Sequence, residues 1–420
     1  MDAYDLIDPS TLGKIVSQEE SPVVDMPAES LGAILAAGGL NMTPKHDAKV
    51  YRFRYTTQDR GQEIEATAMI GFPVGASLGN VPLPLLSYSH VTLGFSDACA
   101  GGRNFVYQMA IAGMASQGYV VVASDYIGMT SHGAPSTVTH AYELGEPAAI
   151  GAWDALRAGE SLITQLEPSI TTTKQTVLAG ASQGSLSIFF QERFGPYYAP
   201  DFDVSAVVGL VPVLDMLKSS DLAVDIYSGN SFYSAVMHTS GHKWYGFDAP
   251  LSSLLSNTEP HFFADNAHSV LYDPENCAYE SDLHQSMDSI DKIYNPDHVA
   301  AILDSGTSSI EHWNCLVREN SILYSSIPTV KKAPTLLYYA ENDAMIPPGP
   351  YAHAYQAMCD NGVPVEYNIC TGAEHSEGIQ WSLPETFIWI DKILAGEATG
   401  PVCEYKEPHC CAGTPTEVCE

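Results

Sequence analysis

The feature that most constrains the fold of this chain is a regular alternation of strand-like and helix-like segments. Short runs rich in β-branched and aromatic residues recur from residue 50 onward, among them GYVVVASDY at 118–126, TVLAGAS at 176–182 and PTLLYYA at 334–340. Amphipathic stretches separate the later runs, and we expect helices over Ala148 to Leu166, Gly184 to Arg193, Pro350 to Asp360 and Leu383 to Leu394. Strands that alternate with helices build a mostly parallel sheet with helices on both faces. The sequence therefore predicts an α/β fold.

Two parts of the chain depart from this alternation. KVYRFRYTT and EIEATAMIGFPV, joined by a turn, predict an antiparallel hairpin at the sheet edge. From about 216 to 330 there is no clear apolar strand, only short helical patterns and polar loops. We interpret this interval as an inserted helical cap over the site, with an ordinary second lobe as the alternative. The expected division is a core of 1–215 and 331–399, a cap of 216–330 and a Cys-rich tail of 400–420.

The charge balance excludes one class of partner. The chain carries 50 Asp and Glu against 18 Lys and Arg, which gives a formal net charge of -32. Such a chain repels nucleic acid phosphates, so we expect no nucleic-acid partner. Its longest apolar runs are far shorter than the roughly 20 residues that cross a bilayer, so we expect no transmembrane segment. The oligomeric state is left open.

The cysteines indicate the compartment. Four of the nine lie within the last eighteen residues, which favours disulfides and a secreted protein, and the odd number leaves at least one thiol unpaired within the chain. The N-terminal MDAYDLIDPS lacks the features of a signal peptide, so a secreted chain would be a mature one. A metal site is the alternative for the tail, although no C-x-x-C spacing supports it. Its ligands would be Cys403, His409, Cys410, Cys411 and Cys419.

The stretch TVLAGASQGSLSIFF at 176–190 places Gly180, Ser182 and Gly184 in a G-x-S-x-G frame. Strand-like residues precede the frame and an apolar helical pattern follows it, as a nucleophile elbow requires. A serine on such a strained turn leaves no room for side chains two residues to either side, which explains the two glycines. We therefore predict that Ser182 is a nucleophile.

A serine nucleophile needs a histidine base and a carboxylate that orients the histidine, and in α/β-hydrolases these follow the serine in the order acid, then histidine. Asp343, in the loop after PTLLYYA, is the predicted acid, with Glu341 and Asp360 as alternatives. His375 lies on a Gly-flanked loop after the next strand-like run, thirty-two residues beyond Asp343. Most other histidines lie in 216–330, so His375 is the predicted base.

Serine hydrolases also need two backbone N–H groups that stabilise the oxyanion. The N–H of Gln183, at the start of the predicted helix, is the first expected donor. We expect the second in the turn HVTLGFSDACAGG and choose Thr92, with Val91 as the alternative. His90 in that turn and Asp125, at the end of another strand, are interpreted as structural.

In this order the segments resemble the secretory lipase family, α/β-hydrolases typified by fungal secreted lipases of the lipase A type. The resemblance runs from about Tyr51 to Leu394. SHVTLGFSDACA is similar to the family's His-Gly-Thr-Thr-Gly turn followed by Cys-Ala, and GASQGS to its Gly-His-Ser-Gln-Gly-Gly elbow. DYIGMTSHG is similar to its Asp-Tyr-x-Gly segment, while ENDAMIPP and GAEHSEG match its acid and histidine loops. The resemblance implies a helical cap before the acid loop and hydrolysis of acyl esters, often of glycerides.

The resemblance also implies a cap disulfide between Cys99 and either Cys277 or Cys315. A second disulfide, Cys359 with Cys370, is plausible across one helix–strand connection. The chain departs from the family pattern at two positions, where Val91 and Ser185 replace glycines. The Cys-rich tail has no counterpart in the family that we can match.

We predict an α/β-hydrolase fold and a secreted serine esterase or lipase that acts on a small-molecule or lipid ester. Ser182 attacks the ester carbonyl, His375 transfers the proton, Asp343 holds the imidazolium, and water then releases the acyl group. This chemistry requires no metal and no organic cofactor. The alternatives are a serine exopeptidase or amidase on the same fold and a non-catalytic binding module.

Seven aromatic residues of the expected cap form either the lining of an acyl pocket or the cap's own core. They are Phe232, Tyr233, Trp244, Tyr245, Phe247, Phe262 and Phe263.

Overall fold

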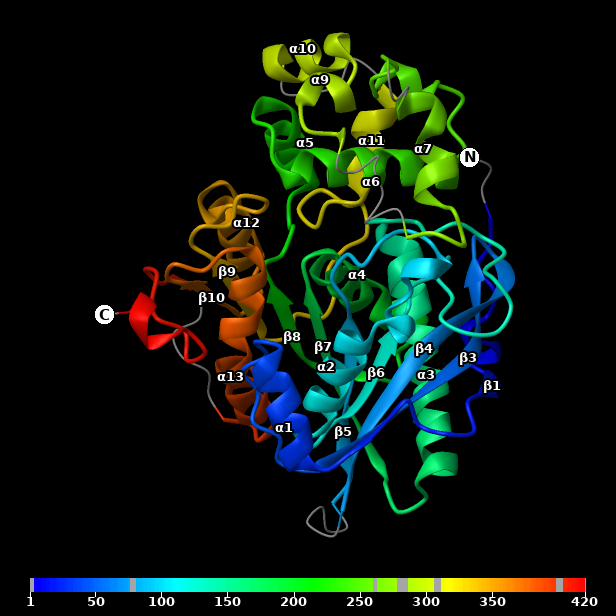
Figure 1. Ribbon diagram of the computed structural model, residues 1–420, viewed down its shortest axis with the longest axis vertical. Helices are drawn as coiled ribbons and strands as arrows, with labels where there is room; N and C mark the ends of the chain where they lie inside the picture. The colour runs from blue at the N-terminus through cyan, green and yellow to red at the C-terminus, as the bar shows by residue number, and fades with distance from the viewer. Residues whose placement is uncertain are drawn as a thin grey trace.

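A computed structural model describes residues 4–75, 81–259, 263–277, 286–305, 311–397 and 403–419. Within these residues one sheet of 11 strands runs through the molecule (Figure 1). Its strands are β1 (Ile15–Gln18), β2 (Val24–Met26), β3 (Asp47–Asp59), β4 (Gln62–Val74), β5 (Leu83–Ser89), β6 (Val120–Ser124), β7 (Thr172–Ala181), β8 (Asp203–Leu210), β9 (Thr335–Ala340), β10 (Val365–Cys370) and β11 (Glu404–Tyr405). The strand order is β1-β3-β4-β6-β5-β7-β8-β9-β10-β11, with β2 paired to β3.

The sheet is antiparallel at one end and parallel over the rest. β3 and β4 form the predicted hairpin, and β4 joins β6 in antiparallel register. From β6 through β5, β7, β8, β9 and β10 to β11 every pairing is parallel. The expectation that the hairpin forms the sheet edge was wrong, because β1 and β2 pair along the outer side of β3. These two strands are too short and too polar to stand out in the sequence.

Helices cover both faces of the sheet, as predicted. One face carries α1 (Ala28–Ala37), α2 (Phe105–Ala115) and α13 (His375–Leu394), and the other carries α3 (Gly145–Leu166), α4 (Gln183–Tyr198) and α12 (Pro348–Asp360). The alternation of side chains along β6 shows the two cores, since Val120 and Val122 belong to one and Val121 and Ala123 to the other.

The four predicted helices all form, but each of them begins earlier than expected and α4 also ends later. The largest error concerns α13, which was expected from Leu383 and begins at His375. Pro384 explains the error, because proline is normally tolerated only in the first turn of a helix. Here it lies in the helix interior.

The interval 216–330 contains helices and, among its described residues, no strand of the central sheet. Its helices are α5 (Met216–Asp225), α6 (Gly229–Tyr245), α7 (Phe263–Leu271), α9 (Ile290–Ile293), α10 (Pro296–Ser305) and α11 (Glu311–Glu319). They stand beyond the carboxyl ends of the parallel strands (Figure 1). The segments that enter and leave the interval are held together, since the Ile322 N–H donates to the Leu214 carbonyl at 3.1 Å and the Met216 N–H to Ser321 Oγ at 3.2 Å.

Four disulfides form among the described residues, and one predicted pairing was wrong. Cys99 joins Cys277, the first of its two expected partners, and Cys315 is free. Cys359 and Cys370 do not pair with each other. Cys370 is the last residue of β10, whereas Cys359 lies in α12 and bonds to Cys403, whose N–H donates to the carbonyl of Val365, the first residue of β10. The six residues of β10 span about 20 Å at roughly 3.3 Å each, whereas bridged Cα atoms lie within about 7 Å.

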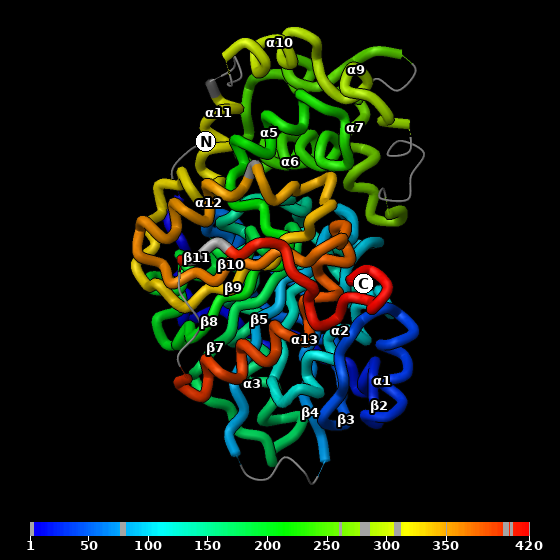
Figure 2. Tube along the Cα trace, turned by 90° about the vertical axis from the view of Figure 1, so that its left-hand side faces the viewer, coloured from blue at the N-terminus to red at the C-terminus, as the bar shows by residue number. Residues whose placement is uncertain are grey.

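Both cysteines instead pair with the tail, which returns along β10. Cys359 joins Cys403, Cys370 joins Cys411, and Cys410 joins Cys419. The short strand β11 extends the sheet by pairing with β10. Figure 2 shows this segment in red crossing the edge of the sheet beside α13.

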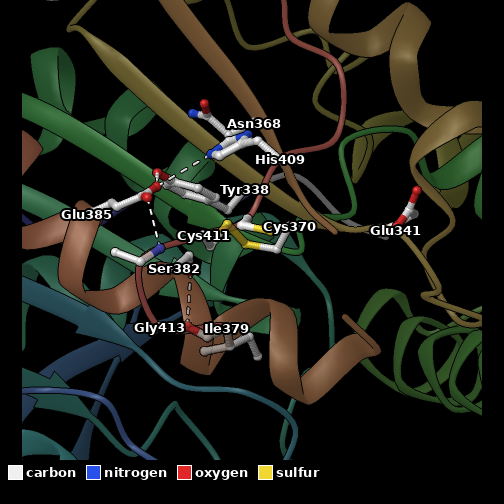
Figure 3. Close-up of a disulfide and its surroundings, with 12 residues drawn as sticks. Tyr338, Glu341, Asn368, Cys370, Ile379, Ser382, Glu385, His409, Cys411 and Gly413 are labelled. Carbon is white, nitrogen blue, oxygen red and sulfur yellow. Dashed lines mark hydrogen bonds and ion pairs between the residues drawn. A yellow bond between two sulfur atoms is a disulfide. The ribbon is translucent and has the colours of Figure 1, made fainter. Parts of the chain in front are cut away.

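The metal site considered for the tail does not form, because all four tail cysteines are in disulfides. Glu385, His409 and Cys411 lie close together, but the Cys411 sulfur is bonded to Cys370 (Figure 3). Glu385 instead accepts hydrogen bonds from the Tyr338 hydroxyl at 2.5 Å and from a tail N–H at 2.9 Å. The cluster fixes the tail to β9 and α13.

We expect removal of the Cys370–Cys411 disulfide to lower the free energy of unfolding by about 2–4 kcal/mol, because the unfolded chain gains conformational freedom. The double variant Cys370→Ala/Cys411→Ala tests this by denaturant unfolding followed by circular dichroism. Cys410→Ala/Cys419→Ala is the matched control, since that disulfide spans only 9 residues at the chain end and its loss should cost less. An equal or smaller loss from the first variant would contradict the role given to the tail.

Candidate active site

Ser182 lies on a strained turn between β7 and α4. Its backbone has φ 52 and ψ −120, and its N–H donates to the Leu210 carbonyl at 2.9 Å. A Cβ atom on Gly180 would lie 2.3 Å from the Gly184 carbonyl oxygen, and one on Gly184 would lie 1.9 Å from the Ser89 carbonyl oxygen. Side chains at either position would collide with the backbone, which accounts for the G-x-S-x-G spacing.

The structure brings Ser182, His375 and Asp343 together. His375 Nε2 lies 3.1 Å from Ser182 Oγ, and His375 Nδ1 lies 2.7 Å from Asp343 Oδ2. The other oxygen, Asp343 Oδ1, accepts the N–H groups of Met345 and Ile346, each at 2.8 Å. The Asp343 side chain is fully buried, whereas the imidazole is 15% exposed. Since a carboxylate only accepts, Nδ1 carries the proton and Nε2 is free to accept the Ser182 proton.

The loops that carry the acid and the histidine are joined to each other. The Asn342 N–H donates to the Ala373 carbonyl at 2.8 Å, and the Gly372 N–H donates to Glu341 Oε2 at 2.7 Å. His375 was expected on a loop but is the first residue of α13. Glu374 is the N-cap of this helix and forms a capping box, so the loop ends at Glu374 and the helix begins at His375.

The alternative acids have other partners. Glu341 holds the histidine loop through Gly372, and Asp360 accepts a hydrogen bond from Gln356 within α12 at 2.9 Å. Asp125 is fully buried, where it accepts hydrogen bonds from the Thr67 hydroxyl and the Gly102 N–H, each at 2.7 Å. None of these carboxyl groups contacts His375.

The predicted oxyanion donors lie beside the serine. Gln183 is the first residue of α4, and Thr92 and Val91 line the same cavity as Ser182. Within the described part of the chain, neither the Gln183 N–H nor the Thr92 N–H has a protein acceptor. Two unpartnered N–H groups next to a serine hydroxyl fit an oxyanion site.

His90 controls the direction of the Thr92 N–H. Its Nδ1 lies 2.6 Å from the Val91 carbonyl oxygen, so Nδ1 carries the proton and donates. A planar trans peptide directs its C=O and N–H to opposite sides, so a fixed Val91 carbonyl fixes the N–H of Thr92. Burial lowers the pKa of His90 to about 4, which keeps the imidazole neutral near neutral pH.

A second buried histidine fixes the Gln183 side chain. His140 Nδ1 donates to the Ile127 carbonyl at 3.2 Å, which leaves Nε2 to accept the Gln183 amide at 3.0 Å. Burial lowers the pKa of His140 to about 3, so it stays neutral. The sequence analysis missed His140, as well as Tyr142 and Glu143, which line the cavity. These residues belong to no recognisable sequence motif, so only their position in the fold identifies them as part of the site.

A cavity of about 140 Å³ lies next to Ser182. It is lined by Val91, Thr92, Tyr142, Glu143, Ser182, Val213, Asn230, Tyr233, Met345, Ile346, His375, Ser376 and Ile379. Of the seven aromatic residues expected in the cap, Tyr233 lines this cavity. Phe262 lies outside the described residues, and the other five pack in hydrophobic clusters. Most of these rings therefore pack in a core, which was the alternative to a pocket lining in the sequence analysis.

The family model for secretory lipases matches residues 105–234 and 249–401. This match covers well over half of the chain. The chain belongs to the secretory lipase family. As a member it is a carboxylic ester hydrolase, and the predicted family is confirmed. No significant match was found among curated protein sequences.

Solved structures confirm the α/β-hydrolase type of fold. The rice cell wall degrading esterase LipA from Xanthomonas oryzae is 18% identical, with a TM-score of 0.73 over 92% of this chain and 99% of that chain. A putative hydrolase from Legionella pneumophila is 20% identical, with a TM-score of 0.73 over 92% and 100%. Candida antarctica lipase A is 15% identical, with a TM-score of 0.67 over 98% and 92%.

Family, disulfides and fold are consistent with an extracellular lipase. Four disulfides form in the described part of the chain, and such bonds persist in oxidising compartments. None of the helices described is both long enough and apolar enough to span a bilayer.

We expect His90→Phe to lower kcat for ester hydrolysis by about tenfold to a hundredfold, because the Thr92 N–H loses its fixed direction. The melting temperature should change little, since His90 Nε2 is buried without a partner and phenylalanine removes that unpaired group. Steady-state kinetics and thermal melting measure the two effects.

His90→Asn is the matched control, because its amide can still donate to the Val91 carbonyl and should preserve more of kcat. An unchanged kcat in a folded His90→Phe enzyme would show that His90 does not position the donor.

Proposed function

We propose that this secretory lipase cleaves carboxylic esters with Ser182 as nucleophile, His375 as general base and acid, and Asp343 as the group that orients the histidine. The observation that carries the proposal is the chain of hydrogen bonds from Ser182 Oγ through the imidazole to Asp343. The position of Ser182 on a strained turn supports it, because such turns expose a nucleophile above the sheet.

In the proposed reaction Ser182 Oγ attacks the ester carbonyl carbon while its proton passes to His375 Nε2. The imidazolium is held by Asp343 and then gives this proton to the leaving alcohol, which departs as the acyl-enzyme forms. Water attacks the acyl-enzyme through the same base and releases the carboxylic acid. The N–H groups of Gln183 and Thr92 stabilise the negative oxygen in both steps.

We expect Ser182→Ala to reduce turnover of a para-nitrophenyl ester by at least about 10⁴-fold, since no other nucleophile replaces the hydroxyl. Asp343→Asn should reduce kcat by about three to four orders of magnitude, because the amide favours the wrong imidazole tautomer. Steady-state rates per folded molecule test both variants. Asp360→Asn is the matched control, since that carboxyl group lies on α12 away from His375. Undiminished turnover in Ser182→Ala would contradict the mechanism.

The helices of 216–330 fit the role of a cap over this site. Asn230 and Tyr233 of α6 line the cavity, and the Cys99–Cys277 disulfide ties the interval to the loop that carries Thr92. Gly94 lies directly against this disulfide, because a Cβ atom there would lie 2.1 Å from Cys99 Sγ. We therefore assign 216–330 to a cap, 1–215 with 331–399 to the core, and the tail after 400 to a brace of the sheet edge.

The size of the cavity favours short acyl chains. A cavity near 150 Å³ accommodates a group about as large as benzene. The cavity beside Ser182 has about 140 Å³, which corresponds to an acyl group of a few carbons. A longer chain would require α6 or the Met345 loop to move.

We expect kcat/KM to be highest for acetyl to hexanoyl esters and to fall by at least about tenfold for dodecanoyl esters. A para-nitrophenyl ester series at concentrations below aggregation measures this. A maximum at long chains would show that the cap opens and that the cavity does not limit the substrate.

An exopeptidase or amidase uses the same triad, so the preference for esters over amides needs its own test. Para-nitroanilides with the same acyl groups as the ester series separate the two activities. Amide turnover well above ester turnover would favour the alternative, and absence of any Ser182-dependent turnover would favour a binding module. Secretion into the extracellular medium is proposed from the family and the disulfides.

A further inference from the structure

The cavity beside Ser182 contains a carboxyl group that the proposed reaction does not use. Glu143 lines this cavity together with Ser182 and His375. Among the residues that the structure describes, Glu143 forms no ion pair. The preceding residue, Tyr142, shares a hydrogen bond with Thr92 Oγ1 at 2.9 Å. A partly buried carboxyl group without an ionic partner is costly to ionise, so its presence needs a reason.

The backbone of Glu143 gives a second observation. Its φ is 54, in the left-handed region that glycine adopts readily and that strains a residue with a Cβ atom. The chain is fixed just beyond it, since the Gly145 N–H donates to Asn320 Oδ1 at 2.8 Å and Gly145 packs against Phe190. Glycine would suit position 143 better if the position served the fold alone. Strained residues of this kind cluster at functional sites, and what glutamate adds here is a carboxyl group at the cavity.

The surroundings favour the neutral form of this carboxyl group near pH 7. Burial raises the pKa of Glu143 to about 8, and the hydrogen bond with the Tyr142 hydroxyl offsets this only in part. The titratable groups around it are the hydroxyls of Tyr126, Tyr142 and Tyr351, with His375 lining the same cavity. A protonated carboxyl group offers one donor and one acceptor, which together match a hydroxyl group.

We propose that Glu143 and Tyr142 form a subsite for a free hydroxyl group of the substrate, so that the enzyme prefers uncharged esters that carry a hydroxyl on the acyl or the alcohol part. The inference rests on the proposed function of Ser182. Val213, Ile346 and Ile379 line the same cavity, and their apolar side chains accept the hydrocarbon part of the hydroxylated acyl or alcohol group.

Two pairs of isosteric esters test the subsite. Para-nitrophenyl β-hydroxybutyrate and para-nitrophenyl isovalerate differ by a hydroxyl against a methyl on the acyl part. Glycol monobutyrate and propyl butyrate differ in the same way on the alcohol part. In one of the two pairs, the wild-type kcat/KM should be about tenfold higher for the ester with the hydroxyl than for the ester with the methyl, because one additional hydrogen bond has an effect of this size. The pair that shows the preference identifies which part of the ester enters the subsite.

Variants at position 143 assign the preference to the carboxyl group. Glu143→Gly suits the backbone, so it should keep the melting temperature while the ratio of kcat/KM within the pair falls to about one. Glu143→Gln keeps a donor and an acceptor and should retain most of the preference. Glu146→Gln is the matched control, because that half-buried carboxyl group follows three residues later and contacts Tyr4 rather than the cavity. Its ratio should equal that of the wild type.

The outcomes separate this inference from the proposed function. Turnover that survives in Ser182→Ala would contradict the proposed function. Turnover that depends on Ser182 without a preference in either pair, or a preference that persists in Glu143→Gly, would overturn the subsite alone. Faster hydrolysis of butyrylcholine than of its uncharged dimethylbutyl isostere, lost in Glu143→Gln, would overturn it too by showing that an ionised carboxyl group binds a cation.

Discussion

The close approach of the start of α4 to the end of β5 is the contact on which the rest of the site depends. Gly184 lies so near the Ser89 carbonyl that no Cβ atom fits between them, and Ser182 adopts φ 52 in consequence. A non-glycine residue in this region costs about 1–3 kcal/mol, which the burial of almost every residue of α4 offsets. The contact directs Ser182 Oγ and the Gln183 N–H to one edge of the sheet.

The parallel sheet supplies the remaining parts at that same edge. β5 is followed by Thr92, β9 by Asp343 and β10 by His375, so three loops meet at the elbow because parallel strands end on the same side. Hydrogen bonds between neighbouring loops, such as that of Asn342 with Ala373, fix the distances between the catalytic side chains, which the strands alone do not determine. The neutral histidines beneath the site hold peptide groups and amides in one orientation at any pH near neutral.

Local rules of sequence predict part of this arrangement. The alternation of strands and helices and the spacing of Gly180, Ser182 and Gly184 are short-range patterns, and the structure contains both. The tail could not be predicted in this way, because the pairing of Cys370 with Cys411 depends on where the chain returns along β10. The role of Glu143 could not be predicted for the same reason, since its strained backbone and its place in the cavity result from contacts with distant residues. Long-range geometry therefore decides the features that the sequence pattern misses.

The central claim is that Ser182 forms the covalent intermediate, and labelling with a fluorophosphonate tests it most directly. Such a reagent phosphonylates a serine only where a base and oxyanion donors activate it. After tryptic digestion, the peptide from Gln175 to Arg193 contains Ser182, Ser185 and Ser187, so fragmentation by mass spectrometry must assign the modified residue. We predict one adduct per chain, on Ser182, and none in Ser182→Ala. An adduct on another residue, or equal labelling of Ser182→Ala, would contradict it.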